Sequence, residues 1–378
     1  MSVGVLQSLP QTIDPKSYQE VNSFVEKVAA KYQIKDFYKI NALKNALLNE
    51  VSFLDAEKLT NSIKVNSPVI GEDIDVYKTL AFTVITKFYI SSIIDKIAKV
   101  YPIKSIVSLV PVTTWTYGDD YAAEGITKGT KLSDKRSKTY SKVAELQKPR
   151  SINYSVDFID IKASVRKITE EFTFEALLNT ASFMTKEQLI DFVNREWTGI
   201  IVAKLKDEIE LQAMDMLRTE AGFKTDYTAS NDACDDCDSK KLVDTIHEVA
   251  NEIYLKTGVY PNTVVIGLDA ERILRKADRY LLEYTNEGGA VLPQAIARNY
   301  VGVLDNKFNV VYDPSFTGVA VIARDMNIDL SPLVYAPYIP LGISKPIAKE
   351  NMSTSRTIFT VDAVKVVYPE LIGYIAIK

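Results

Sequence analysis

The longest regular pattern of hydrophobic positions lies in residues 185–221, where an apolar residue recurs at every fourth position. This spacing predicts one continuous helix, because positions four apart lie on the same side of an α-helix. Thr185 and Gln188 form a T-x-x-Q capping box at its start, and Gly222 is a stop signal at its end. About 36 residues give a rod of about 54 Å, which indicates a structural beam. The recurring positions are Leu189, Val193, Trp197, Ile201, Leu205, Ile209, Ala213 and Leu217.

Two stretches of alternating polar and apolar residues precede this helix. Residues 103–118 are rich in β-branched and aromatic residues and end at Gly118. The alternation resumes after Pro149 and continues through Val156, Phe158, Ile159 and Ile161, and later through Val165, Ile168, Phe172 and Phe174. We therefore predict a strand that enters a hairpin and a long strand that returns from it. Trp115, near the base of this hairpin, is either an ordinary core residue or an anchor for a neighbouring chain.

Residues 128–150 concentrate positive charge between these two strands. Eight Lys or Arg residues stand against Asp134 and Glu145, a net charge of +6, and the rest of the chain therefore carries −10. One interpretation is a solvated loop. The other is a basic hairpin that docks on an acidic surface, for which another copy of this chain is the obvious partner. The candidate contact residues are Lys128, Lys131, Lys135, Arg136, Lys138, Lys142, Lys148 and Arg150.

The first hundred residues combine helical periodicity with a polar character. Within residues 17–33, one apolar face is formed by Val21, Phe24, Val25, Val28 and Tyr32. Residues 61–73 contain Pro68 and Gly71 among Asn and Ser and indicate a linker. We expect these helices to have little to bury by themselves. Residues 1–100 are therefore predicted to form an extended arm that lies across another surface.

The remainder of the chain, beyond the long helix, shows a mixed pattern. The sequence predicts a helix at 241–257 that ends at Gly258, and a helix at 270–284 capped by Asp269. Strands are predicted at 262–268, 307–313 and 318–325. Residues 356–378 are rich in β-forming residues to the end. We expect this segment to pair with earlier strands and not to form a separate domain.

Composition limits the class of protein. With 47% apolar residues the chain can fill a sizeable core, and a net charge of −4 offers no general attraction for nucleic acid. Lys87 and Asp95 interrupt the most hydrophobic stretch, residues 79–100, so we expect a buried amphipathic helix and no membrane span. Two cysteines exclude a disulfide framework, and the first residues lack a secretory signal. These features predict a protein made in a reducing cytoplasm.

Both cysteines, Cys234 and Cys237, lie in one C-x-x-C motif, which raises the alternatives of a redox centre and a zinc site. Four aspartates surround the pair and would raise the pKa of a thiolate by charge repulsion. A structural zinc ion needs four ligands, and only these two thiols are near in sequence, unless several copies contribute to one site. We predict a polar connecting loop ahead of the helix at 241–257, assign no metal or cofactor, and keep a C-x-x-C redox or zinc enzyme as a distant alternative.

The remaining candidates for catalysis are few. The single histidine, His247, lies at the edge of an apolar helical stripe, which indicates a partly exposed structural residue. The sequence contains no G-x-x-x-x-G-K-[ST], H-E-x-x-H or G-x-S-x-G motif. We therefore predict that the chain is not an enzyme.

The order of these predicted parts resembles a known family. The segments that carry the resemblance, within residues 98–378, are YPIKSIVSLVPVTTWTYG, VDFIDIKASVRKITEEFTFEALLNTASFMTKEQL, GVLDNKFNVVYDP, SPLVYAPYIPLGI and RTIFTVDAVKVVYPELIGYIAI. Together they resemble the major capsid proteins of tailed bacteriophages, whose fold is named after phage Hong Kong 97, and more narrowly the T4-like branch. The resemblance implies an α+β fold with an N-terminal arm, an extended E-loop, a peripheral domain containing a long spine helix, and an axial domain.

The resemblance also implies where these parts lie. The arm would be 1–100, the E-loop 119–152, the peripheral domain 103–118, 153–222 and 343–378 with the spine helix at 185–221, and the axial domain 223–342.

In this family many copies build the hexameric and pentameric capsomers of an icosahedral head that encloses double-stranded DNA. The resemblance therefore implies a structural protein of the virion, assembled in the host cytoplasm, whose main partner is itself. Portal, scaffold and decoration proteins are further expected partners, with weak contact to DNA and none to a membrane. An encapsulin-like shell, which encloses a cargo enzyme, is the alternative within the same fold.

Overall fold

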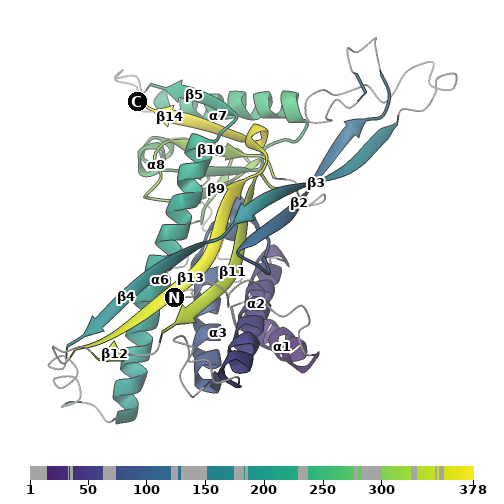
Figure 1. Cartoon of the computed structure of the whole chain (residues 1–378). Coiled ribbons are helices and arrows are strands. Elements are labelled where there is room, and N and C mark those ends of the chain that lie inside the picture. Colours follow the sequence, from purple (N-terminus) through teal and green to yellow (C-terminus); the bar gives the residue numbers. More distant parts are fainter. Residues whose placement is uncertain are drawn as a thin grey trace.

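The computed structural model describes most of the chain, and Figure 1 shows how its helices and strands are arranged. The described residues are 15–32, 34, 37–62, 74–120, 127–128, 151–173, 183, 186–228, 237–275, 280–281, 300–324, 330–344, 347–348 and 353–378. The helices within them are α1 (Pro15–Lys31), α2 (Phe37–Ser62), α3 (Ile74–Ser91), α4 (Ile94–Ile97), α6 (Lys186–Thr219), α7 (Cys237–Thr257), α8 (Leu268–Leu274) and the 3-10 helix η4 (Pro369–Leu371).

The described strands form three sheets. The first contains β1 (Ala98–Val100), β4 (Ser164–Phe172), β11 (Leu333–Ile343), β12 (Ile347–Ala348) and β13 (Thr354–Val366). The second has the order β5 (Phe223–Tyr227), β14 (Ile372–Ile377), β10 (Val319–Ile322), β6 (Thr263–Ile266), β9 (Phe308–Tyr312), β8 (Tyr300–Leu304) and β7 (Tyr280–Leu281). The third pairs β2 (Val107–Tyr117) with β3 (Ile152–Lys162). This combination of helices and largely antiparallel strands confirms the predicted α+β class.

The long helix α6 confirms the predicted spine helix. Its 34 residues correspond to about 51 Å. Four of its buried side chains follow the predicted spacing of four: Leu205, Ile209, Ala213 and Leu217. Beyond its end, the Gly222 N–H donates to the Pro369 carbonyl oxygen at 2.9 Å, and a Cβ on Gly222 would lie 2.6 Å from that oxygen. Glycine at this position therefore permits a close approach of two backbones.

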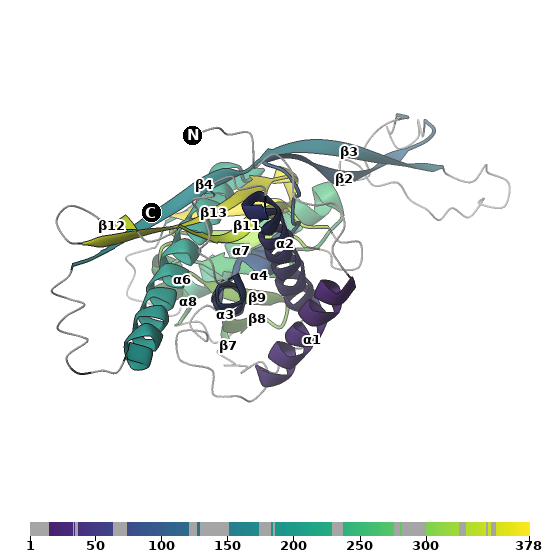
Figure 2. The same ribbon diagram turned by 60° about the horizontal axis from the view of Figure 1, so that its bottom comes forward.

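The expectation that the first hundred residues bury little is wrong. Helices α1, α2 and α3 pack on one another, and α2 and α3 also lie against β11. Figure 2 shows α2, α3 and α6 gathered on one side of the strands β4, β11 and β13. Apolar residues occur all round α2, which therefore needs cover on more than one side. The largest core cluster includes Val25, Leu43, Leu47, Phe53, Ile85 and Phe88 from these helices.

Polar side chains of α2 also satisfy the backbone of an irregular strand. Strand β11 contains Pro337, and its register against β13 shifts just after this residue. Such a bulge leaves backbone groups without ladder partners. The buried Asn49 side chain donates to the Pro337 carbonyl oxygen at 3.0 Å, and the buried Glu50 carboxylate accepts from the Leu341 N–H at 3.2 Å. These bonds fix α2 to the sheet of its own subunit.

The seven-stranded sheet contains the C-terminal strand. Strand β14 runs antiparallel to β10 and parallel to β5, which confirms that the end of the chain closes onto earlier strands. Helix α7 packs on this sheet and ends before Gly258, whose φ of +78° lies in the left-handed region that favours glycine. The predicted end of this helix is therefore confirmed.

The predicted start of α8 is wrong in one respect. The N-cap residue is Gly267, and Asp269 lies inside the helix. The Asp269 carboxylate accepts a hydrogen bond from the Ala270 N–H, in the first turn, at 2.8 Å, and another from the Gly318 N–H at 2.9 Å. The helix also ends at Leu274, well before residue 284. The carboxylate therefore serves a local N–H of the helix and a backbone donor that is distant in sequence.

The predicted domain boundaries assign β11 to the axial domain and β14 to the peripheral domain, but each strand pairs in the sheet of the other domain. Strand β11, which lies inside 223–342 except for Ile343, pairs with β13, and β14, inside 343–378, pairs with β10. The alternation of polar and apolar residues identifies a strand but does not name its neighbour. The division into sheets therefore does not follow the order of the chain.

Candidate assembly surface

A two-stranded ribbon projects from the body of the molecule. Strands β2 and β3 pair antiparallel without a register shift from Val107 opposite Lys162 to Tyr117 opposite Ile152. Figures 1 and 2 show this ribbon extending beyond the rest of the described chain. The predicted outgoing strand is thus confirmed. The predicted long returning strand is divided at Ala163 into β3 and β4, which pair in different sheets.

The ribbon has two apolar faces with different surroundings. Val110 and Ile161, on one face, are 2% and 1% exposed and belong to the main core cluster. Side chains alternate between the two faces, so the residues beside them point the other way. We call that side the outer ribbon face, and it carries Val107 (62% exposed), Leu109 (53%), Val156 (39%) and Phe158 (62%). The exposed Asp160 and Lys162 lie opposite Leu109 and Val107 on this face, and such a mixture of exposed apolar and charged side chains is typical of a protein–protein contact.

The predicted contact residues of the hairpin are described only at its base. Trp115 lies in β2 opposite Tyr154, and its side chain lies outside the described residues. The Lys128 N–H donates to the Asp120 carboxylate at 2.6 Å. Lys131, Lys135, Arg136, Lys138, Lys142, Lys148 and Arg150 lie outside the described residues. Their roles remain predictions.

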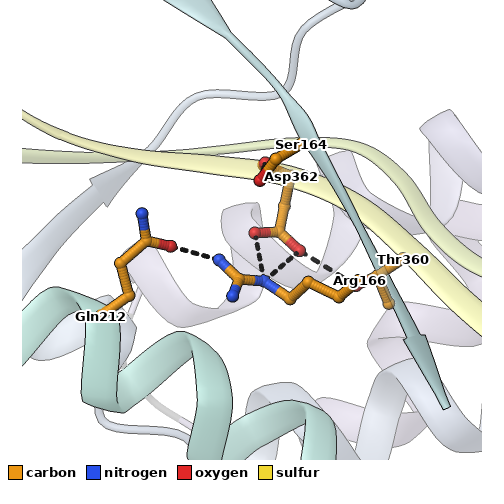
Figure 3. Close-up of polar contacts among 5 residues, drawn as sticks. All are labelled: Ser164, Arg166, Gln212, Thr360 and Asp362. Atoms are coloured by element: carbon orange, nitrogen blue, oxygen red, sulfur yellow. Dashed lines mark hydrogen bonds and ion pairs between the residues drawn. The ribbon is translucent and has the colours of Figure 1, made fainter.

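A buried ion pair fixes the root of the ribbon. Strand β3 leads directly into β4, which pairs with β13 along its length. From β4, the Arg166 Nε atom lies 3.0 Å from Oδ1 and 3.3 Å from Oδ2 of Asp362 on β13 (Figure 3). An Arg166 terminal nitrogen donates to the side-chain oxygen of Gln212 on α6, and the Thr360 hydroxyl donates to Asp362 at 3.0 Å. We call Arg166, Gln212, Thr360 and Asp362 the ribbon clamp.

The ribbon clamp contains two charged side chains that are largely buried. The Asp362 side chain is 1% exposed and that of Arg166 is 15% exposed. Burial raises the pKa of the Asp362 carboxyl, and the guanidinium of Arg166 opposes that increase. The clamp joins the strand that continues the ribbon to both the sheet and the spine helix. None of these four residues is among the predicted site residues, although Arg166 shares the inward-facing side of β4 with Ile168, and a charged residue at such a position is a recognisable signal.

The C-x-x-C motif does not have the predicted setting. Cys237 is the first residue of α7, rather than part of a loop that ends at residue 240, whereas Cys234 lies outside the described residues. Asp238 in the first turn favours the earlier helix start, because the N-terminal end of a helix attracts negative charge. Within the described residues, no group of three or more His, Cys, Asp or Glu side chains could hold a metal ion.

His247 has the structural setting that its pattern indicates. Its Nε2 atom lies 3.0 Å from an Asp305 carboxylate oxygen, and its ring centroid lies 5.2 Å from that of Phe308. The side chain is partly exposed. These contacts join α7 to the turn before β9.

None of the helices in the described parts of the chain is long and apolar enough to cross a membrane.

A comparison with protein-family models gives a match over residues 86–365 to the family described as major capsid protein Gp23. The chain belongs to this family. The matched region contains the ribbon, the clamp, the spine helix and most of both large sheets. This membership confirms the resemblance to the T4-like major capsid proteins, and the protein is a structural capsid protein.

Solved structures similar to the chain include other shells. The mature capsid of bacteriophage PhiM1 is 13% identical, with 77% of this chain and 86% of that chain covered and a TM-score of 0.43. The capsid of Myoviridae phage XM1 is 10% identical, with coverage of 72% and 86% and a TM-score of 0.41. A virus-like particle from Pyrococcus furiosus is 9% identical, with coverage of 79% and 96% and a TM-score of 0.43. A search of curated proteins gave no match. The assignment rests on the family match.

Proposed function

We propose that this major capsid protein assembles into hexameric and pentameric capsomers of an icosahedral head that encloses double-stranded DNA. The outer ribbon face is the observation that carries this proposal. A two-stranded ribbon is marginally stable by itself, so an exposed apolar face along it calls for a covering surface. A second copy of the chain provides that surface in our proposal.

Ring formation requires two different patches that meet repeatedly around an axis. The ribbon with its basic hairpin is one patch, and the acidic remainder of the chain, with a net charge of −10, is the source of the other. Apolar contact along the ribbon and charge attraction at its tip would act together, because the first supplies stability and the second selects partner and orientation. Trp115 and the eight basic residues of 128–150 remain candidate contacts within this arrangement.

The domain names follow the same proposal. The E-loop is 119–152, with β2 and β3 as its base. The spine helix, β4, β11 and β13 would form the peripheral domain, and the seven-stranded sheet with α7 and α8 the axial domain. The presence of two separate large sheets supports this division. The N-terminal helices would belong to the peripheral domain and would not form an independent arm, because they share its core.

The remaining partners and the location also belong to this proposal. The head would be assembled in the host cytoplasm and would contact portal, scaffold and decoration proteins. Net acidity supports weak, non-specific contact with the enclosed DNA, because phosphate binding depends on basic side chains. We infer no catalytic role, since the family is structural and the sequence lacks the catalytic motifs discussed above.

Electron microscopy and sedimentation of the purified full-length chain, over a range of salt concentrations, test this function. We expect closed shells or capsomer-sized rings. Small monodisperse oligomers under every condition would contradict the assembly proposal. Analysis of shell contents then separates the two shell types, since DNA indicates a virus head and a cargo enzyme would instead indicate an encapsulin-like compartment.

A further inference from the structure

A second buried carboxylate joins the opposite side of the spine helix to the N-terminal helices. Glu210 of α6 is 5% exposed and points at the corner between α3 and α4. One of its oxygens, Oε1, accepts from the Ser92 hydroxyl and from the Ile93 N–H, both at 2.9 Å. The Ser92 hydroxyl oxygen also accepts from the N–H of Ile94, the first residue of α4, at 3.1 Å. One carboxyl oxygen therefore holds the corner through two donors.

The other carboxyl oxygen has a different environment. Glu210 Oε2 lies 3.7 Å from the Lys206 ammonium nitrogen, one turn earlier on the same helix. Among the described residues outside α6, Asp313, a buried acid that follows β9, acts on Glu210 by its charge. The carboxylate of Asp313 accepts from the N–H and the hydroxyl of Ser315 at 2.8 and 2.6 Å. Its negative charge therefore opposes a negative charge on Glu210.

We propose that Glu210 is a proton-linked latch, which holds the corner between α3 and α4 on the spine helix when its carboxyl group takes up a proton and loosens when it loses that proton. A proton on Oε2 would replace the contact with the Lys206 ammonium and would leave Oε1 able to keep both hydrogen bonds to the corner. This inference goes beyond shell assembly and does not depend on it.

The direction of the effect follows from linkage. Burial raises the pKa of Glu210 to about 7, against the lowering effects of Lys206 and of the two donors at the corner. In an open latch the carboxyl group meets water and titrates near its ordinary value of 4.5. The closed form therefore binds the proton more tightly, so acid favours the closed form and rising pH favours the open one. Between pH 5 and 8, this difference shifts the equilibrium by roughly 10–100-fold.

A small movement of the corner between α3 and α4 would be transmitted along the chain to the ribbon. The corner leads through α4 and β1 to the start of β2, within about fifteen residues of chain. At that point the Ala163 N–H, between β3 and β4, donates to the Ile106 carbonyl oxygen at 2.8 Å. The latch and the ribbon clamp thus act on the same helix, from the helical side and from the ribbon side respectively.

Hydrogen exchange followed by mass spectrometry tests the latch in the full-length chain. Exchange of the segment 92–97 is measured at pH 5.5 and 8.0 and divided by the rate of the same peptide unfolded at that pH. We expect protection in the wild type to fall about tenfold or more at the higher pH. Glu210→Gln keeps the shape and the acceptor oxygen but not the charge, so its protection should stay high at both pH values.

Two further variants complete the test. Asp207→Asn removes one charge from an exposed position on the same helix and should keep the wild-type pH response. Ser92→Ala removes one donor and should lower protection at both pH values. Equal wild-type protection at the two pH values, or a pH response that persists in Glu210→Gln, would overturn the latch. Neither result bears on whether shells form, because sedimentation of the same samples reports assembly separately.

Discussion

The guanidinium of Arg166 lies on the carboxylate of Asp362, with Nε 3.0 Å from Oδ1, and this contact joins the strand that continues the ribbon to the centre of a sheet. A buried acid held by one base is sensitive to loss of that base, since the remaining charge has no compensation. Loss of Arg166 would therefore leave a buried carboxylate without its cation at the root of the ribbon.

Replacing Arg166 should destabilise the subunit strongly. We expect Arg166→Met to lower the free energy of unfolding by about 3–5 kcal/mol, because Asp362 stays buried without its partner. Urea unfolding followed by circular dichroism measures the change. The exposed pair Arg218–Asp215 on α6 is the matched control, and Arg218→Met should cost less than about 1 kcal/mol. Similar costs for the two variants would show that the clamp does not hold the fold.

The Glu210 carboxyl should make the overall stability depend on pH. Its pKa is about 7 in the folded chain against 4.5 for the ordinary group, so the wild type loses stability as the pH rises between these values. Glu210→Gln lacks this loss. We expect the variant to be more stable than the wild type by up to about 3 kcal/mol above pH 7 and to differ little near pH 4.5. Denaturant unfolding at several pH values measures it, and parallel curves for the two proteins would contradict the prediction.

The two faces of the ribbon should respond differently to substitution. Phe158→Ser, on the outer ribbon face, should leave subunit stability within about 0.5 kcal/mol. The same change should raise the concentration needed for assembly about tenfold, because the neighbouring subunit would lose its apolar contact with the phenyl ring. Val110→Ala, on the core face, should instead destabilise the subunit by about 2 kcal/mol. Sedimentation and thermal unfolding separate the two effects. Unchanged assembly of Phe158→Ser would remove the outer ribbon face from the interface.

The basic hairpin should contribute to docking by charge. Reversal of Lys135, Arg136 and Lys138 to Glu is expected to impair assembly and to leave the circular dichroism of the subunit unchanged. Exchange of Lys for Arg and Arg for Lys at the same three positions keeps the charge and should assemble normally. Added salt should weaken wild-type docking in the same direction, because it screens the attraction. A charge-reversed chain that assembles like the wild type would eliminate this role.

The two cysteines should be dispensable. We expect the double variant Cys234→Ser and Cys237→Ser to build particles with wild-type yield in electron micrographs. The structural reason is that zinc needs four ligands and this motif provides two thiols. Failure of the double variant, accompanied by zinc in wild-type particles, would point instead to a metal shared between copies.

Local sequence patterns were sufficient to predict the main helices and strands. The four-residue spacing around Leu205 and Ile209 predicts α6, and the alternation through Val156 and Phe158 predicts β3, because helix and strand periods depend only on backbone geometry. Gly258 marks the end of α7 for an equally local reason, since its left-handed φ suits glycine. Together with the order of segments, these patterns led to the capsid family.

Contacts between distant segments determined the rest. The sequence alone placed the N-terminal helices outside the core, whereas Asn49 and Glu50 tie α2 to a bulged strand almost three hundred residues away. It also gave no indication that Arg166 meets Asp362 or that Glu210 is buried beneath Ser92. Burial and charge pairing depend on which surfaces meet in space. The sequence by itself determined the elements, their order and the family, and only the tertiary structure decided which face of the ribbon stays exposed and which carboxyl groups hold the spine helix.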